Sequence, residues 1–343
     1  MTTLDLMNKQ WTLAARPIGS VKETDFRFLM TPVSTPRDGQ ILVRNALISV
    51  DPAMRSWMNE GKSYMEAVRI DDVMRAAGAG YVLHSKDSRF KVGDAVTGLV
   101  GVQEYTILEA KDAVKVDAAS APLGSYLNVL GLPGFTAYFG LLEIGQLKEG
   151  ETVLVSGAAG AVGSAVGQIA KVKGCRVIGI AGGEEKCKYV TETLGFDAAV
   201  DYKSPDVRKL LSRACGNGVD VYFDNVGGTI LDLALTRLRP RARIVVCGAV
   251  SQYNNMDRGE GPKNYMALLM YRARMEGFVI FDYEARYPEA QSQLREWLTA
   301  GKIRSHEDMV DGFMEFPRAL GRMFEGANTG KMLVRLHDDA GAA

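Results

Sequence analysis

The stretch "VSGAAGAVGSAVGQIAKVKG", residues 155–174, decides the fold of this chain. Its glycines Gly157, Gly160 and Gly163 stand three apart, between a β-branched run and a helical apolar pattern. A strand that ends at Gly157 and leads directly into a helix leaves backbone N–H groups pointing outward, where the helix dipole favours a phosphate. A side chain at Gly160 would stand between the backbone and a pyrophosphate. Because the spacing differs from the commoner G-x-G-x-x-G, a turn that serves only tight strand–helix packing is the alternative.

Buried strands and helical stretches alternate from Glu151 onward, which is typical of a doubly wound parallel sheet. We expect strands at residues 152–156, 176–180, 198–200, 219–224, 243–248 and 275–280. We expect helices centred near Val166, Tyr189, Leu210, Leu233, Met270 and Trp297. Six strands in this pattern predict an α/β Rossmann domain, and a dinucleotide is then the expected ligand of the glycine turn.

The residues before this domain have a different texture, with short extended segments separated by Gly, Pro and Asp. These segments lie at residues 41–50, 80–84, 94–100 and 102–108. Near the C-terminus, residues 309–313 and 331–336 are again predicted to be extended, with a helix at 316–326 between them. The chain of 343 residues is long enough for two domains. We therefore predict a mostly β domain from residues 1–125 and 301–343, and a Rossmann domain from residues 126–300.

Composition narrows the class of partner. The formal net charge is zero, with 47% apolar and 24% charged residues, so neither nucleic acid nor an anionic membrane is expected as partner. No run of apolar residues is long enough to span a bilayer, and the N-terminus lacks the apolar core of a signal peptide, so we expect a cytoplasmic protein. A small molecule is the expected substrate. The four cysteines, at positions 175, 187, 215 and 247, have no metal-ligand spacing and are expected to be free thiols.

The end of the second Rossmann strand predicts which dinucleotide binds. An acidic residue there would bind the ribose 2′-hydroxyl of NAD, but this strand ends in Ala181-Gly182-Gly183. The glycines leave room for a 2′-phosphate, and Lys186 on the next helix brings an ammonium group within reach. The sequence therefore favours NADP(H). In the alternative interpretation, Lys186 is solvated surface, or Glu184 and Glu185 occupy the pocket.

Motifs along nearly the whole chain carry a family resemblance. They include "LISVDPAMRSWM", "LGLPGFTAYFGLLEIGQLKEGETVLVSGAAGAVGS", "YFDNVGG", "VCGAVSQYN", "RMEGFVI" and "GANTGKMLVRL". With these motifs the chain resembles the zinc-independent medium-chain dehydrogenase/reductases of the leukotriene B4 12-hydroxydehydrogenase and prostaglandin reductase group, and most of all their bacterial curcumin reductase branch. The resemblance implies a GroES-like domain completed by the C-terminus, an inserted Rossmann domain, and a homodimer formed through the Rossmann sheet.

The resemblance also implies a set of NADP(H) contacts. These are Gly160, Ala161, Val162, Gly163, Lys186, Tyr202, Asn225, Cys247, Gly248, Ala249, Val250, Ser251, Gln252, Tyr253, Phe278, Val279, Ile280 and Asn328. Asn225 ends a predicted strand at the carboxyl edge of the sheet, where dinucleotides lie, although it also fits a simple turn residue before two glycines. No metal is expected, because no cysteine precedes Cys175 and His84 is the only histidine before His306.

A reaction without metal follows from this reading. Hydride from NADPH, delivered to the β-carbon of an α,β-unsaturated ketone or aldehyde, leaves an enolate that needs a hydrogen-bond donor and a proton. The resemblance implies Tyr271 near the enolate oxygen, helped by the nicotinamide ribose hydroxyl, and Tyr253 in the lining of the cleft. From the residues alone, Tyr271 also fits core or dimer surface, and Asp51, a second candidate acid or base, fits better as a turn residue before Pro52.

The predicted function is NADPH-dependent double-bond reduction, with a quinone reductase or a non-catalytic nucleotide-binding protein as alternatives. The chain departs from the family pattern at two positions that flank its substrate cleft, where Ala53 replaces the usual Tyr and Arg75 lies in a normally glycine-rich stretch. Arg75 would attract a carboxylate or point to solvent. The residues Met54, Trp57, Met58, Tyr64 and Met65 fit an adaptable apolar wall, but their spacing favours core packing.

Overall fold

The computed structural model describes residues 3–61, 63–258 and 261–337. The chain forms two compact units, of which the first contains the chain up to Leu127 and resumes at Glu307, and the second runs from Asn128 to His306. The first unit is built around a mixed sheet and the second around a parallel sheet, so the predicted fold class is confirmed. Within the described residues, no helix is both long and apolar enough to cross a membrane.

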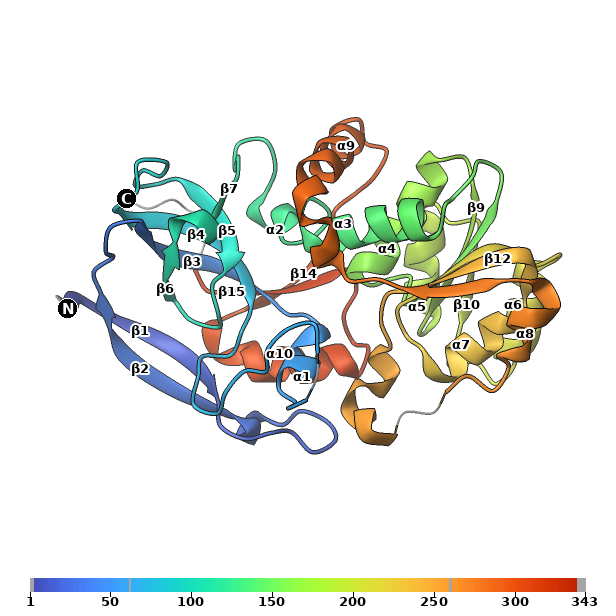
Figure 1. The fold of residues 1–343 in the computed structure, drawn as a ribbon, viewed down its shortest axis with the longest axis horizontal. Helices are drawn as coiled ribbons and strands as arrows, with labels where there is room; N and C mark the ends of the chain where they lie inside the picture. The colour runs from blue at the N-terminus through green and yellow to red at the C-terminus, as the bar shows by residue number, and fades with distance from the viewer. Residues whose placement is uncertain (1–2, 62, 259–260, 338–343) are drawn as a thin grey trace. The chain divides into compact units, whose positions relative to one another are not determined.

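The first unit consists mainly of strands (Figure 1). Its strands are β1 (Thr3–Leu13), β2 (Phe26–Ser34), β3 (Gln40–Ser49), β4 (Ala77–Ser85), β5 (Ala95–Leu99), β6 (Tyr105–Glu109), β7 (Val114–Lys115), β14 (Glu307–Asp311) and β15 (Lys331–Arg335). Its helices are α1 (Ala53–Trp57), α2 (Leu123–Tyr126) and α10 (Phe316–Phe324). Strands β1 and β2 pair with each other, and the larger sheet has the order β14-β15-β3-β4-β5-β7, with β6 also paired to β3.

A late strand of the chain pairs with an early one in this larger sheet. Strand β15 pairs antiparallel with β3, and the red and blue ribbons lie side by side in Figure 1. Beneath them, one core cluster joins Ile41 and Ile48 of β3 to Phe316 and Leu320 of α10. Burial of these side chains, at about 25 cal/mol per Å² of apolar surface, ties the C-terminal segment to strands that lie almost 300 residues earlier in the sequence.

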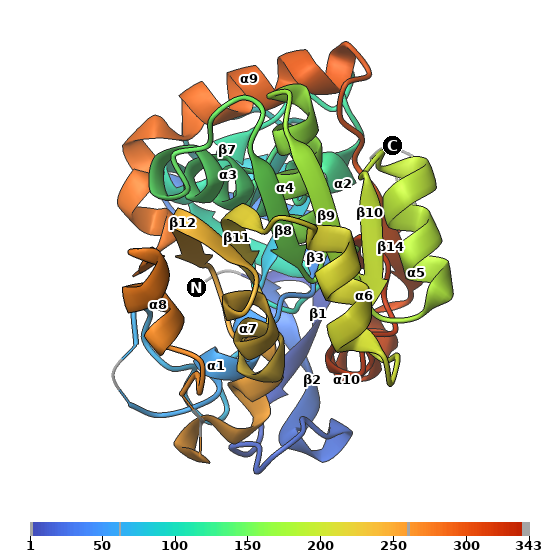
Figure 2. The same cartoon turned by 90° about the vertical axis from the view of Figure 1, so that its right-hand side faces the viewer.

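The second unit is a doubly wound sheet (Figure 2). Its strands are β8 (Thr152–Ser156), β9 (Arg176–Ala181), β10 (Ala198–Asp201), β11 (Val219–Asp224), β12 (Leu238–Val246) and β13 (Arg274–Gly277). Its helices are α3 (Leu132–Phe139), α4 (Ala161–Val172), α5 (Glu184–Lys188), α6 (Val207–Cys215), α7 (Gly228–Leu235), α8 (Met266–Tyr271) and α9 (Tyr287–Thr299). Among the described residues the sheet has six parallel strands in the order β10-β9-β8-β11-β12-β13.

Both faces of this sheet are covered, which explains why its strands read as continuous apolar runs. Side chains of α6, α7 and α8 share one core cluster with Leu154, Ile178 and Ile244 on one face. On the other side, α3 packs against α4 and α9. In Figure 2 the two groups of helices lie on opposite sides of the strands.

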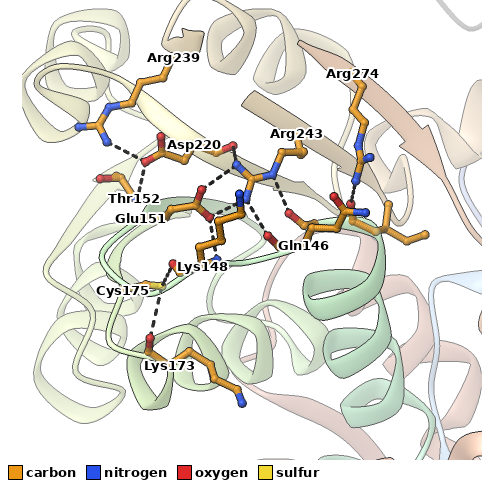
Figure 3. Close-up of polar contacts among 12 residues, drawn as sticks. Gln146, Lys148, Glu151, Thr152, Lys173, Cys175, Asp220, Arg239, Arg243 and Arg274 are labelled. Carbon is orange, nitrogen blue, oxygen red and sulfur yellow. Dashed lines mark hydrogen bonds and ion pairs between the residues drawn. The ribbon is translucent and has the colours of Figure 1, made fainter. Parts of the chain in front are cut away.

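At the amino ends of the strands, Arg243 joins the sheet to the segment before β8 (Figure 3). Its guanidinium forms a bidentate ion pair with Glu151, at 2.9 and 2.5 Å, and donates to the carbonyl oxygens of Gly145 and Gln146 at 2.8 and 3.0 Å. Those carbonyls follow a π-helical turn, Gly140–Ile144, and lack helical partners. Nearby, Arg274 donates to the Ile144 carbonyl at 2.5 Å. This network braces the end of the sheet opposite the glycine turn.

Several predicted elements differ from the structure in their bounds. The strand expected at 243–248 is β12, which begins at Leu238 and ends at Val246. The strand expected at 275–280 ends at Gly277, because its partner β12 ends at Val246 and offers no further backbone groups. The helix expected around Tyr189 is α5 followed by a π-helical turn, Tyr189–Thr193. There the Thr191 hydroxyl donates to the Cys187 carbonyl at 3.1 Å and competes for helical acceptors.

Candidate functional site

The glycine turn joins β8 to α4, as expected from its sequence. Gly157 has φ +60°, a left-handed conformation that glycine adopts without strain. A Cβ atom at Gly163 would lie 2.2 Å from the Gly157 carbonyl oxygen, so this glycine is required by the close approach of helix to strand. Two of the three glycines therefore serve the turn and the packing.

Gly160 is different. Its φ of −86° suits any residue, and a Cβ there would meet only the Gly157 carbonyl oxygen, at 3.3 Å, with the space otherwise open. Gly160 caps the N-terminus of a helix whose first residues, Ala161, Val162 and Gly163, have N–H groups without helical acceptors. The space that a Cβ would fill lies beside these donors, and this arrangement fits a pyrophosphate.

The carboxyl ends of β9 and β10 form the next part of the site. The Asp201 carboxylate accepts hydrogen bonds from the backbone of Gly183 at 2.8 Å and of Lys203 at 2.9 Å, and so holds the turn after β9. Gly182 lies against the ring of Tyr202, since a Cβ there would be 2.8 Å from that ring. The two predicted neighbours of the 2′-phosphate, Tyr202 and the helix that carries Lys186, are thereby tied to one turn.

One of the two acidic residues that were the alternative in this region, Glu184, has a partner on its own helix. Glu184 forms an ion pair with Lys188 at 2.8 Å, one turn along α5. The hydrogen bond and charge of Lys188 lower the pKa of the Glu184 carboxyl. Lys186 itself is half-buried on the same short helix. The cofactor role of Lys186 stays a prediction, and so does the alternative in which Glu184 and Glu185 occupy the pocket.

The ends of β11 and β12 form a second group of predicted cofactor residues. The Asn225 side chain donates to the Ser156 carbonyl oxygen at 2.7 Å. The backbone carbonyl oxygen of Asn225 accepts from the Val250 N–H at 3.2 Å. The Ser251 hydroxyl donates to the Val226 carbonyl at 2.6 Å. Residues Cys247, Gly248, Ala249, Val250, Ser251, Gln252 and Tyr253 therefore form a segment that packs on the turn after β11. Its first three residues are a loop, and Val250 begins a 3₁₀ helix, Val250–Arg258.

Burial raises the pKa of two side chains in this part of the site, the Cys247 thiol and the Tyr222 hydroxyl. Burial and the nearby Asp224 carboxylate raise the pKa of the Cys247 thiol to about 12. The same two causes raise the pKa of the Tyr222 hydroxyl well above its usual value. Neither group is an acid or base near neutral pH, so Cys247 is expected to contribute through its backbone.

The remaining predicted cofactor residues lie in two places. Phe278, Val279 and Ile280 follow β13, and the Phe278 ring packs edge-on to Tyr283 with centroids 6.4 Å apart. Asn328 belongs to the first unit, in the loop before β15, where its side chain donates to the Gly330 carbonyl at 3.0 Å. All other predicted cofactor residues belong to the second unit.

The two predicted catalytic tyrosines have different surroundings. The Tyr253 hydroxyl accepts a hydrogen bond of 3.3 Å from the Ala249 N–H, so it lies over its own loop at the end of β12. Tyr271 is the last residue of α8, and its half-buried ring packs against the core cluster of the parallel sheet. The ring of Tyr271 thus has the packing role that was the alternative, and the role of its hydroxyl stays a prediction.

Asp51 is a turn residue, as the sequence favoured. Its carboxylate forms an ion pair of 2.7 Å with Lys331, whose side chain is 2% exposed, and accepts a hydrogen bond from the Ser49 hydroxyl. Lys331 also donates to the Val50 carbonyl at 2.7 Å. The ion pair therefore fixes the turn that leads into α1.

The expected apolar wall is mostly core. Met54, Trp57 and Met58 are buried in the cluster of the first unit, whereas Tyr64 is 54% exposed. Arg75 lies over the Trp57 ring at 5.6 Å and donates to the Glu66 carbonyl at 2.7 Å. Among the described residues, no three His, Cys, Asp or Glu side chains gather in a group that would hold a metal ion.

Two positioning carboxylates were missed from the sequence. Asp201 and Asp224 are the last residues of β10 and β11, and both accept backbone hydrogen bonds from the turns of the candidate site. The signal that would have found them is an acidic residue directly after a buried apolar run, at the edge where dinucleotides bind.

Comparisons with known proteins identify relatives along the whole chain. Residues 9–116 match a family model described as the N-terminal domain of oxidoreductase, and residues 161–296 match one described as zinc-binding dehydrogenase. An NADPH-dependent curcumin reductase of Escherichia coli is 43% identical, over 97% of this chain and 98% of its own. An NADP-dependent 2-alkenal reductase of Nicotiana tabacum is 40% identical, over 96% and 98%. The crystal structure of CurA from Vibrio vulnificus in complex with NADPH superposes with a TM-score of 0.91, at 43% identity over 96% of this chain and 99% of that one.

Proposed function

Because this chain belongs to the curcumin and 2-alkenal reductase family of NADP-dependent oxidoreductases, we propose that it reduces the carbon–carbon double bond of α,β-unsaturated ketones and aldehydes. A 2-alkenal is by definition an α,β-unsaturated aldehyde, and curcumin contains conjugated enones. The observation that carries the proposal is the open space at Gly160, beside the free N–H groups of α4, in a chain whose NADP(H) dependence follows from its family.

Each part of the site has a distinct task in this reaction. Bound NADPH supplies the hydride that adds to the β-carbon of the substrate. The turn at Gly160 and the first turn of α4 bind the pyrophosphate, and Lys186 and Tyr202 bind the 2′-phosphate. Tyr271 donates a hydrogen bond to the carbonyl oxygen, where negative charge develops, and the un-ionised phenol is the form that has this proton. Tyr253 lines the substrate side of the loop after β12.

A substrate panel tests the proposal. The purified enzyme is given NADPH with 2-alkenals, linear enones and benzoquinones, and the loss of NADPH absorbance is measured as kcat/KM. We expect the enones and enals to be preferred, with the saturated carbonyl as product. A preference for quinones would instead make the protein a quinone reductase. Tight NADPH binding without turnover of any compound would support a non-catalytic nucleotide-binding protein.

Lys186→Ala is expected to weaken NADPH binding about tenfold or more and to leave NADH binding nearly unchanged, because only NADPH carries the 2′-phosphate. Titration of both cofactors by fluorescence measures the effect. Lys188→Ala is the matched control, since Lys188 lies on the same helix but is paired with Glu184. Equal losses for NADPH and NADH in Lys186→Ala would contradict the role of this lysine.

We further propose that the protein forms a homodimer through the edge of the parallel sheet. Strand β13 is the edge strand, so one row of its backbone groups is available for pairing. Beside it, α8 and its N-cap residue Tyr265 present an exposed apolar face. Its side chains, Tyr265, Met266, Leu269 and Met270, are 48% to 69% exposed. In Figure 2, α8 lies next to β12 at this side of the sheet.

Leu269→Asp is expected to convert the dimer into a monomer, because it places a charge in the centre of the exposed apolar face. Sedimentation velocity at several protein concentrations measures the change. Leu210→Asp is a control, since Leu210 is a partly exposed leucine on α6, away from β13 in the strand order. A wild-type protein that sediments as a monomer would refute the dimer.

A further inference from the structure

Asp224 is a buried carboxylate to which the reaction gives no role. Its side chain lies at the end of β11, and the residue is 1% exposed. One oxygen, Oδ1, accepts four hydrogen bonds: from the Tyr222 hydroxyl at 2.7 Å, the Ser156 hydroxyl at 3.0 Å, and the N–H groups of Val226 and Gly227 at 3.1 and 2.9 Å. A single atom thus gathers donors from two strands and the turn between β11 and α7.

The backbone of Asp224 extends this junction to a third strand. Its carbonyl oxygen accepts from the N–H groups of Cys247 and Gly248, at 2.9 and 3.1 Å, where β12 ends. Ser156, which donates to Asp224, also accepts from the Asn225 N–H at 2.9 Å. The ends of β8, β11 and β12 are therefore joined through one residue.

The position of this junction in the sheet has a consequence for the cofactor. In the order β10-β9-β8-β11-β12-β13, the direction of winding reverses between β8 and β11. Dinucleotides bind outside the carboxyl ends of the strands at this reversal, with one mononucleotide on each half of the sheet. The hydrogen bond between Ser156 on β8 and Asp224 on β11 joins the two strands on either side of this reversal. Asp224 therefore belongs to the half of the sheet formed by β11, β12 and β13.

Stability alone does not account for this carboxylate. Within the part of the chain that the structure describes, Asp224 has no cationic partner. A buried charge without a counterion is costly, and well-packed apolar groups are often at least as stable. The carboxylate is better explained by its effect on geometry, because three of the four hydrogen bonds to Oδ1 come from Ser156 and from the Val226 and Gly227 N–H groups, which hold the turn that contains Asn225.

We propose that Asp224 is a positioning residue for the nicotinamide half of NADP(H). Its carboxylate holds the turn that contains Asn225, whose backbone carbonyl oxygen accepts from the Val250 N–H. The adenosine half binds to β8, β9 and β10, where Asp201 organises the turn at Gly183. Loss of the Asp224 carboxylate then affects the two halves of the cofactor unequally.

The test compares NADPH with adenosine 2′,5′-bisphosphate, which lacks the nicotinamide half. In Asp224→Ala, which removes the Oδ1 acceptor, we expect the dissociation constant of NADPH to rise at least about tenfold and that of the bisphosphate to stay within about twofold. Both are measured by calorimetry without substrate, so the result does not depend on the substrate assignment. A second readout is the split between KM and kcat, since the KM for NADPH should rise.

Asp220→Ala is the matched control. Asp220 is on the same strand and also bridges β11 to β8, by accepting from the Thr152 N–H at 2.8 Å, but it lies at the amino end (Figure 3). We expect its NADPH affinity to stay within about twofold of the wild type. If Asp224→Ala does not fold, Tyr222→Phe decides, because it removes one donor to Asp224 and keeps the ring.

Two outcomes would overturn the proposal. In the first, folded Asp224→Ala or Tyr222→Phe binds NADPH as tightly as the wild type. In the second, NADPH and the bisphosphate lose affinity by equal factors, which would make Asp224 a support of the whole unit and not of the nicotinamide half.

Discussion

Gly160→Thr is expected to lower the affinity for NADPH at least about 100-fold while the melting temperature stays within a few degrees of the wild type. The threonine side chain would occupy the open space beside the first turn of α4 and displace the pyrophosphate from the helix N–H groups. Loss of two charge-assisted hydrogen bonds, each about 1.5 to 3 kcal/mol, corresponds to a factor of 100 or more. Calorimetric titration with NADPH measures the effect.

The fold should tolerate this substitution. Gly160 has a φ of −86°, and the nearest atom to a Cβ is 3.3 Å away. Threonine and glycine are similar as helix N-caps, so α4 keeps its start. Gly163→Ala is the contrasting control, because its Cβ would stand 2.2 Å from the Gly157 carbonyl oxygen and should unfold the protein or lower its melting temperature strongly. A Gly160→Thr protein with normal NADPH affinity would show that the pyrophosphate binds elsewhere.

Tyr271→Phe is expected to lower kcat and kcat/KM together by about 100-fold, with NADPH affinity unchanged. Phenylalanine keeps the packing of the ring against the core cluster and removes only the hydroxyl that we place at the enolate oxygen. Loss of one such donor costs about 2.7 to 4 kcal/mol, and we expect the lower end because the nicotinamide ribose hydroxyl shares the role. Steady-state kinetics on a good enone, together with NADPH titration, measure both quantities.

Tyr253→Phe is the control for the neighbouring hydroxyl. The Tyr253 hydroxyl accepts a hydrogen bond from the Ala249 N–H. Tyr253→Phe removes one hydroxyl, as Tyr271→Phe does, but from the segment after β12. Full activity of Tyr271→Phe with loss of activity in Tyr253→Phe would reverse the two roles. If both variants are fully active, the proton comes from water or the cofactor, and the catalytic assignment is wrong while the cofactor site stands.

Much of the candidate site was predictable because its signals are local. The glycine turn, the absence of an acidic residue after β9 and the placement of Lys186 can all be read within residues 155–186, and the alternation of strands and helices gave the class of domain. The turn role of Asp51 also followed from its neighbour Pro52. Local preferences of this kind act between residues close in sequence, so they can be recognised without knowing the fold.

Other features depended on contacts between distant residues. The sequence could not show that Asp224 meets Ser156 across 68 positions, nor that β13 ends where β12 offers no further partner. The pairing of Glu184 with Lys188 has helical spacing, yet only the folded chain shows that this ion pair forms. Side-chain partners follow from packing, which the pattern of residue types along the chain does not specify.

The sequence by itself therefore determined the class of fold, the glycine turn and the preference for NADP(H), because each depends on backbone freedom, periodicity or charge within one short segment. Only the tertiary structure decided what each glycine is for. Gly163 makes room for the backbone of Gly157, whereas Gly160 leaves a space that no protein atom fills. The three glycines look alike in sequence, and they differ because the packing of strand against helix surrounds one position with backbone atoms and leaves the other open.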